Sequence, residues 1–186
     1  MSKVILVTGG ARSGKSNFAE KLCIDRNNST AYIATSIPFD DEMKDRVKKH
    51  KESRPQNWKT YEIYKDIYSI IEEISKNHKT IILDCVTLLV NNLMFTYDLD
   101  IDKARQDEIN NLELYIKDQV NKLIKEIKST NLYFVAVTNE LGMAVVPANK
   151  LSRVYTDIVG RINQQIASQS DEVYFVVSGI PMKIKG

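Results

Sequence analysis

Residues 3–16 of the chain read KVILVTGGARSGKS, and this stretch decides the fold. The apolar and β-branched run over residues 4–8 predicts a buried strand. The glycine-rich residues after it match the pattern GxxxxGK followed by Ser or Thr, and a helical spacing of apolar side chains begins directly afterwards. Strand, loop and helix in this order are typical of a loop whose main-chain N–H groups and helix end face a polyphosphate. We therefore expect a P-loop NTPase-like nucleotide-binding fold.

The residues of this loop are the predicted phosphate cradle, and two of them have further roles. Lys15 carries a mobile charge that can offset charge developing on phosphate, which makes it a candidate catalytic residue. The Ser16 hydroxyl is a candidate Mg²⁺ ligand. The cradle comprises Gly9, Gly10, Ala11, Arg12, Ser13, Gly14, Lys15 and Ser16. A glycine-rich turn that binds nothing is the simpler alternative, and the strand and helix on either side count against it.

Short apolar runs alternate with helical stretches along the rest of the chain. Strands are predicted at 3–8, 31–35, 58–62, 80–84, 132–138 and 171–177, and helices at 15–26, 40–51, 67–75, 101–129 and 149–168. This alternation predicts an α/β protein with a mainly parallel seven-stranded sheet and helices on both faces. The seventh strand, 182–185, follows the sixth too closely for a crossover, so we expect an antiparallel edge hairpin. No linker or repeat divides residues 1–186, which predicts one nucleotide-binding catalytic domain.

The composition excludes several classes of partner. Among 186 residues, 26 basic side chains face 24 acidic ones, and a net charge of +2 gives no reason to expect nucleic acid as a partner. No run approaches the roughly 18 apolar residues of a membrane span. The residues before Gly9 are too few for a secretory signal. Cys23 and Cys85 lack metal-ligand spacing and are expected to be reduced thiols. Together these features predict a cytoplasmic protein.

Asp84 is the second candidate metal ligand. It ends the predicted strand 80–84, and the carboxyl ends of parallel strands gather at the edge where the glycine-rich loop also lies. A carboxylate there can hold Mg²⁺ directly or through water. The alternative is a solvated residue at a strand end. A GTPase switch is disfavoured, because residues 84–87 read DCVT and not DxxG, and residues 138–141 read TNEL and not NKxD.

His50 is the candidate nucleophile. It lies on the predicted helix 40–51, on one face with Arg46 and Val47. Lysine and arginine side chains surround it in the sequence, and their charge favours the neutral, nucleophilic imidazole. A solvated histidine on a basic helix is the alternative, and these residues alone do not decide between the two.

With these segments in view, the chain resembles the bifunctional adenosylcobinamide kinase/adenosylcobinamide-phosphate guanylyltransferases of cobalamin biosynthesis. The similarity runs in order along nearly the whole chain. The loop 9–16 is shared by many proteins, whereas the histidine helix and residues 138–143 are specific to this family. The segments that carry the resemblance are 9–16, 32–36, 41–43 with Arg46, His50 and Arg54, then Trp58, Thr60 and Glu62, 84–87 with Asn92 and Leu93, 137–143 with Val146 and Pro147, then Arg153, Asp157, Gly160, Arg161, Asn163 and Gln164, and 171–174 with Gly179.

The resemblance implies two reactions at one nucleotide site. ATP or GTP would phosphorylate adenosylcobinamide, and GMP from GTP would then pass through a covalent GMP–histidine intermediate on His50 to give adenosylcobinamide-GDP. The family is also implied to assemble as a homotrimer, with the corrinoid near subunit boundaries, and the Mg²⁺ expected from Ser16 and Asp84 would serve as its cofactor. Further nucleotide contacts implied by position are Thr35, Ser36, Ile37, Lys51, Glu52, Ser53, Arg54, Glu62 and Asp84. Relatives often carry glutamate at the position of Asp84, and the shorter side chain leaves open whether its metal contact is direct.

Two other functions stay open at this point. A P-loop small-molecule kinase without guanylyl transfer would have no use for His50. A nucleotide-dependent binding module would turn over neither substrate.

Overall fold

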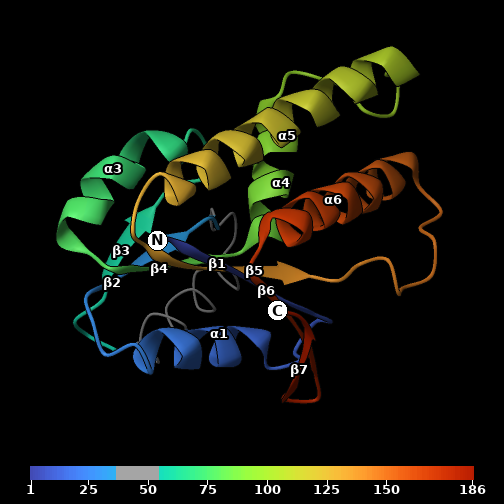
Figure 1. The fold of residues 1–186 in the computed structure, drawn as a ribbon. Helices are drawn as coiled ribbons and strands as arrows, with labels where there is room; N and C mark the ends of the chain where they lie inside the picture. The colour runs from blue at the N-terminus through green and yellow to red at the C-terminus, as the bar shows by residue number, and fades with distance from the viewer. Residues whose placement is uncertain (37–54) are drawn as a thin grey trace.

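Seven strands form one continuous sheet in the computed structural model, which describes residues 1–36 and 55–186 (Figure 1). The strands are β1 (Lys3–Gly9), β2 (Thr30–Ala34), β3 (Lys59–Glu62), β4 (Thr80–Asp84), β5 (Tyr133–Asn139), β6 (Glu172–Val177) and β7 (Ile180–Lys185). Their order across the sheet is β3-β2-β4-β5-β1-β6-β7. Every neighbouring pair from β3 to β6 is parallel, and β7 runs antiparallel to β6. The predicted mainly parallel seven-stranded sheet with an antiparallel edge strand is confirmed.

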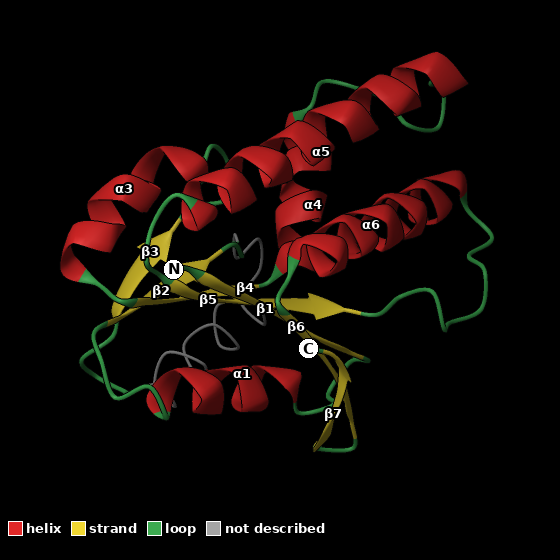
Figure 2. Ribbon diagram, in the orientation of Figure 1, coloured by secondary structure: helices red, strands yellow, loops and turns green. Residues whose placement is uncertain are grey.

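Helices cover both faces of this sheet, as predicted (Figure 2). In the described part of the chain, α1 (Lys15–Ile24) covers one face by itself. The helices on the opposite face are α3 (Tyr68–Asn77), α4 (Val86–Thr96), α5 (Gln106–Lys128) and α6 (Lys150–Gln169). None of the described helices is long and apolar enough to cross a bilayer.

Side chains that alternate along the strands fill two cores. On β1, Val4 and Leu6 pack with the apolar residues of α3, α5 and α6. Ile5 and Val7 point to the other face and pack with Ala19 of α1. Because both faces are covered, the central strands are continuous apolar runs, which is the pattern by which the sequence marks them.

Helix α4 was absent from the sequence-based prediction, and this is the main correction to the fold. Its sequence, VTLLVNNLMFT, is apolar nearly all round, so it lacks the one-sided periodicity by which amphipathic helices are recognised. The residues buried in it are Val86, Thr87, Leu89, Val90, Asn92, Leu93 and Met94. A helix buried on most sides gives an apolar run that periodicity alone does not distinguish from a strand.

The other boundaries follow the predictions with one exception. The predicted helix 101–129 begins only at Gln106, because Arg105 is its N-cap and the Glu108 side chain accepts a hydrogen bond from the Arg105 N–H at 2.8 Å. The remaining described elements differ from prediction by at most two residues at either end. The predicted helix 40–51 lies outside the described residues.

Candidate active site

The carboxyl ends of four central strands place the candidate site. Gly9 at the end of β1 is opposite Asn139 at the end of β5, and Ala34 at the end of β2 is opposite Asp84 at the end of β4. The loop 9–16 and the predicted metal ligand Asp84 therefore share one edge of the sheet. Two strand spacings separate β1 from β4, about 10 Å.

The glycine-rich loop needs glycine at two positions for different reasons. A Cβ atom on Gly9 would lie 2.5 Å from the carbonyl oxygen of Val176 and 2.7 Å from Ser13 Oγ, so no side chain fits there. Gly14, the N-cap of α1, has φ of +91°, a left-handed conformation that L side chains rarely adopt. These two glycines let the backbone curl from β1 into the start of α1.

Two side chains of the loop suit a phosphate ligand. The Lys15 ammonium folds back and donates to the carbonyl oxygen of Gly10 at 3.1 Å, and Lys15 is only 9% exposed. Ser13 Oγ in the loop is buried and has no hydrogen-bond partner among the described residues. An unpaired buried hydroxyl costs about 1–3 kcal/mol, which an incoming oxyanion would recover. The donors at the base of this loop therefore fit an anionic group.

Asp84 lies within electrostatic reach of this loop. Tyr32 donates a hydrogen bond from its hydroxyl to Asp84 Oδ2 at 2.9 Å. The next residue, Cys85, has a pKa raised to about 11 by burial and by the charge of Asp84, and the positive charge of Lys15 opposes that rise. The charge of Lys15 therefore reaches the end of β4, where Asp84 and Cys85 lie.

The donor set matches Mg²⁺ in kind, although the protein would supply few of the ligands. No group of three or more His, Cys, Asp or Glu side chains with metal-binding geometry occurs in residues 1–36 and 55–186. Ser16 and Asp84 offer one hydroxyl and one carboxylate, both hard oxygen donors. Mg²⁺ is commonly held by one or two protein oxygens together with substrate phosphates and water, and the site fits this pattern.

Thr35 links the ends of β2 and β4, and its hydroxyl, N–H and carbonyl all form hydrogen bonds. Its hydroxyl donates to the Cys85 carbonyl at 2.7 Å and accepts from the Cys85 N–H at 2.9 Å. Its N–H donates to the Asp84 carbonyl at 3.3 Å, and its own carbonyl accepts from Asn92 Nδ2 at 2.6 Å. Thr35 is 1% exposed, so these hydrogen bonds are buried and tie the ends of β2 and β4 together. Direct contact of Thr35 with a nucleotide stays a prediction.

A second polar network joins β5, α4 and α6 beside the loop. Asn139 Nδ2 donates to Thr87 Oγ1 at 2.8 Å, and the Thr87 carbonyl accepts from the Tyr155 hydroxyl at 3.0 Å. Asn163 of α6 bonds to both Thr138 Oγ1 at 2.7 Å and the Asn139 carbonyl at 3.0 Å. These residues fix the end of β5 next to Gly9.

Sequence reasoning missed the structural roles of Asn92 and Tyr155. Asn92 is 3% exposed inside an apolar helix, and an amide in such a run signals a buried partner. Tyr155 carries no comparable signal, because its partner Thr87 is 68 residues away in sequence.

The turn between β6 and β7 braces the glycine-rich loop, which the sequence did not predict. The N–H of Gly179 donates to the Ser13 carbonyl at 2.7 Å. A Cβ atom on Gly14 would lie 3.0 Å from Gly179 Cα, so the two backbones are in close contact. The edge hairpin thus lies beside α1 and supports the start of that helix (Figure 1).

The remaining predicted residues are less close to the loop or are not described. Ser36 follows Thr35 directly after β2. Glu62 ends β3, four strands from β1 and so about 19 Å across the sheet. Contact of Glu62 with a nucleotide stays a prediction. The predicted residues that lie outside the described part of the chain are Ile37, His50, Lys51, Glu52, Ser53 and Arg54.

A glycine-rich loop after the first strand, with a carboxylate at the end of another parallel strand of the same sheet, defines a P-loop nucleotide-binding α/β protein. Within this class, the sequence pattern of the cobinamide kinase/cobinamide phosphate guanyltransferase family matches residues 5–184. The chain belongs to this family of enzymes, as its resemblance to the family predicts.

Three relatives support this membership. The chain is 43% identical over 182 residues to a protein of Escherichia coli (strain K12) named bifunctional adenosylcobalamin biosynthesis protein CobU, covering 98% of this chain and 99% of that protein. The protein of the same name from Salmonella typhimurium gives the same identity and coverage. The bifunctional adenosylcobalamin biosynthesis protein CobP of Pseudomonas aeruginosa is 33% identical and covers 97% of this chain and 96% of its own length.

A solved structure of a KaiC-like protein from Pyrococcus horikoshii OT3 is similar with a TM-score of 0.47 and 12% identity, over 93% of this chain and 70% of that one. At this level the likeness adds nothing to the assignment.

Proposed function

We propose that this chain phosphorylates adenosylcobinamide with ATP or GTP and then transfers GMP from GTP to the product, with both reactions at the loop 9–16. Membership of the family supports both activities. The observation that carries the shared site is the single phosphate cradle of the described residues, in which Lys15 and the buried hydroxyl of Ser13 lie at one edge with Asp84.

In the kinase step, the substrate hydroxyl oxygen would attack the γ-phosphorus, and the bond from that phosphorus to the β–γ bridging oxygen would break. The hydroxyl proton leaves and the nucleoside diphosphate is released. Lys15 would exchange its hydrogen bond to the Gly10 carbonyl for phosphate oxygens, and the N–H groups of the loop would hold the others. This step needs positioning and charge neutralisation but no covalent intermediate.

In the transfer step, a neutral imidazole nitrogen of His50 would attack the α-phosphorus of GTP and displace pyrophosphate. A phosphate oxygen of adenosylcobinamide phosphate would then attack the same phosphorus, and the histidine would leave unchanged. Histidine is one of the side chains that form covalent intermediates of this kind. The role of His50 rests on its sequence context and on the family resemblance.

Ser16 and Asp84 would hold Mg²⁺, which neutralises charge on the β- and γ-phosphate oxygens when bound. Both side chains are oxygen donors at the edge where the loop lies.

The cytoplasmic location of the protein also stays a prediction.

The proposal is tested by incubating the protein with GTP labelled at the α-phosphate. A phosphoramidate on histidine is acid-labile and base-stable, so we expect label on wild-type protein with those properties and none on His50→Asn. Label that survives in His50→Asn would move the nucleophile elsewhere. Absence of label from wild-type protein would leave only a kinase or a binding module.

We also propose a homotrimer, as the family resemblance implies. Several apolar side chains between β5 and α6 are strongly exposed in the single chain, among them Met143 at 78%, Val145 at 92% and Val146 at 76%. An assembly that covers them would remove a substantial apolar area from water. Light scattering should give about three chains per particle, and a monomer at micromolar concentration would contradict the proposal.

A further inference from the structure

The hydroxyl of Tyr32 reaches Asp84 from a neighbouring strand. Tyr32 on β2 is opposite Ile82 on β4, two residues before Asp84. Because strand side chains alternate, Ile82 and Asp84 project from the same face, and the phenol ring lies along that face toward the strand end. Its hydroxyl donates to Asp84 Oδ2 at 2.9 Å. The other carboxylate oxygen, Oδ1, has no hydrogen-bond partner among the described residues.

Tyr32 lies in the apolar core, where packing alone does not require a hydroxyl. The side chain is 1% exposed and belongs to the apolar cluster on the α1 face. Its ring packs beside Trp58, with 6.4 Å between the ring centroids. A buried hydroxyl is costly unless it is hydrogen-bonded, so phenylalanine would serve packing as well. The bond to Asp84 is the feature that distinguishes tyrosine at this position.

We propose that Tyr32 is a positioning residue that fixes the Asp84 carboxylate for the magnesium complex of the nucleotide. The hydrogen bond to Oδ2 restricts rotation of the carboxylate and leaves Oδ1 as the oxygen for the metal or its water. A phenol is a neutral donor, so it adds no positive charge beside Asp84, as a lysine or arginine partner would. This inference rests on the proposed role of Asp84 in holding Mg²⁺.

A hydrogen bond of this kind is effective because it restricts rotation of the carboxylate before the metal binds. Carboxylates that bind metals are commonly held by a further hydrogen bond, and loss of that bond typically lowers metal affinity 10–100-fold. Asp84 has only one methylene between backbone and carboxylate, so a fixed orientation decides which oxygen faces the loop.

The test is Tyr32→Phe, which removes one oxygen and keeps the ring. Binding of a non-hydrolysable GTP analogue is titrated with and without Mg²⁺, and the Mg²⁺ concentration at half-maximal tight binding is measured. We expect this concentration to rise about tenfold in Tyr32→Phe, with metal-free nucleotide affinity unchanged. An equal loss of affinity with and without Mg²⁺ would mean a packing role, and an unchanged Mg²⁺ dependence would also overturn the inference.

A matched control is available on the same face of the sheet. Tyr174 of β6 donates to Glu172 Oε2 at 2.8 Å, a second tyrosine–carboxylate bond. Glu172 is opposite Ile5, four residues before the loop begins at Gly9. Tyr174→Phe should leave the Mg²⁺ dependence as in wild-type protein. A shift as large as that of Tyr32→Phe would show that loss of any such hydroxyl loosens the sheet.

Asp84→Asn separates this inference from the proposal on which it rests. If Asp84 holds the metal, Asp84→Asn should strongly weaken the Mg²⁺ dependence, and Tyr32→Phe in that background should add nothing. If Asp84→Asn leaves the dependence unchanged, the metal role of Asp84 is wrong and the role of Tyr32 falls with it. If Asp84→Asn has its effect but the two changes are additive, only the positioning role is wrong.

Discussion

Lys15 and Glu172 are two charged residues with different expected roles. Lys15 is expected to serve catalysis, and Glu172 to stabilise the fold. Lys15 folds onto the Gly10 carbonyl at 3.1 Å, inside the loop that it would serve. Its ammonium is therefore already placed where phosphate oxygens would bind. Glu172 is already engaged at the other end of the sheet, where it accepts from Lys3 at 2.7 Å and Tyr174 at 2.8 Å and pairs with Lys183 at 3.1 Å.

Lys15→Ala is expected to abolish both phosphoryl and guanylyl transfer, because the two reactions would share one cradle and one lysine. The loss should reach at least about 10²-fold in kcat, the usual scale for one electrostatic contact at a reacting phosphate or oxyanion. Both activities are measured on the same preparation, with the unfolding temperature as a check on folding. Retention of either activity within a few-fold of wild type would show that the loop is not its catalytic site.

Glu172→Gln is expected to remove a pH-dependent part of stability. The hydrogen bond from Lys3, supported by Tyr174 and Lys183, lowers the pKa of Glu172 from 4.5 to about 2. A carboxyl whose folded-state pKa is depressed stabilises the protein above its unfolded pKa, and this contribution is lost as the pH falls from about 4.5 toward 2. The variant should lose about 1–3 kcal/mol at pH 7 and less at pH 3, as measured by denaturant unfolding. Equal losses at both pH values would contradict this assignment.

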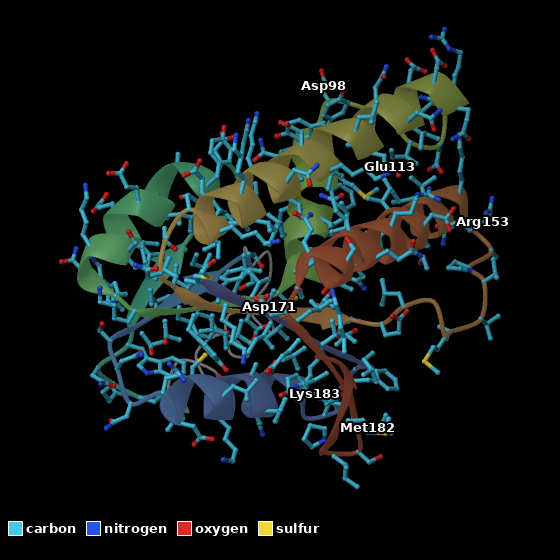
Figure 3. The ribbon with its side chains drawn as sticks, viewed as in Figure 1. Asp98, Glu113, Arg153, Asp171, Met182 and Lys183 are labelled. Carbon is cyan, nitrogen blue, oxygen red and sulfur yellow. The ribbon has the colours of Figure 1, made fainter. Side chains whose placement is uncertain are left out.

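At the scale of elements, the hairpin formed by β6 and β7 is needed to explain the shape of the phosphate loop. Its turn residue Gly179 has φ of +82° and donates its N–H to the Ser13 carbonyl at 2.7 Å. β7 itself is exposed along its whole length. Met182 and Lys183 lie on it beside α1 (Figure 3). The strand therefore adds little to the core, and its turn is the part that contacts the candidate site.

Gly179→Ala is expected to weaken nucleotide binding about three- to tenfold, because alanine at a left-handed φ costs about 1–2 kcal/mol and the turn would shift away from Ser13. The control is Gly160→Ala in α6, where a Cβ atom meets nothing within 4 Å. That change should leave nucleotide affinity unaltered and add slightly to stability. If both variants bind the GTP analogue as wild-type protein does, the turn does not support the loop.

Some of these elements and contacts can be predicted from the sequence, and others cannot. β1, the loop and α1 are contiguous, so one stretch predicts all three elements and the cradle within them. Asp84 was predicted because it ends a strand, and the carboxyl ends of parallel strands meet at the edge of the sheet where the loop lies. α4 was not predicted, because a helix buried on most sides has no polar face to reveal it. The bond from Tyr32 to Asp84 joins residues 52 positions apart, and only the strand order places them together.

At the scale of the whole molecule, α5 and α6 are joined by charged groups away from the candidate site. Glu113, labelled in Figure 3, lies on α5 and is 9% exposed. It accepts from Arg161 Nε of α6 at 2.9 Å and pairs with Lys117 Nζ at 2.7 Å. This bond gives Arg161 a structural role between helices. The sheet edge that carries the loop and Asp84 stays clear of these ion pairs, so the molecule separates the contacts that hold its helices from those that would bind nucleotide.

The central claim is that one nucleotide site performs two chemistries, of which only one needs a nucleophile on the protein. His50→Asn keeps a polar side chain of similar size and removes the attacking nitrogen. Kinase activity with ATP or GTP and guanylyl transfer to adenosylcobinamide phosphate are measured side by side on wild-type and variant protein. We expect kinase activity within a few-fold of wild type and guanylyl transfer at background, because in-line phosphoryl transfer needs no covalent intermediate. Equal loss of both activities, or guanylyl transfer that survives, would contradict the account.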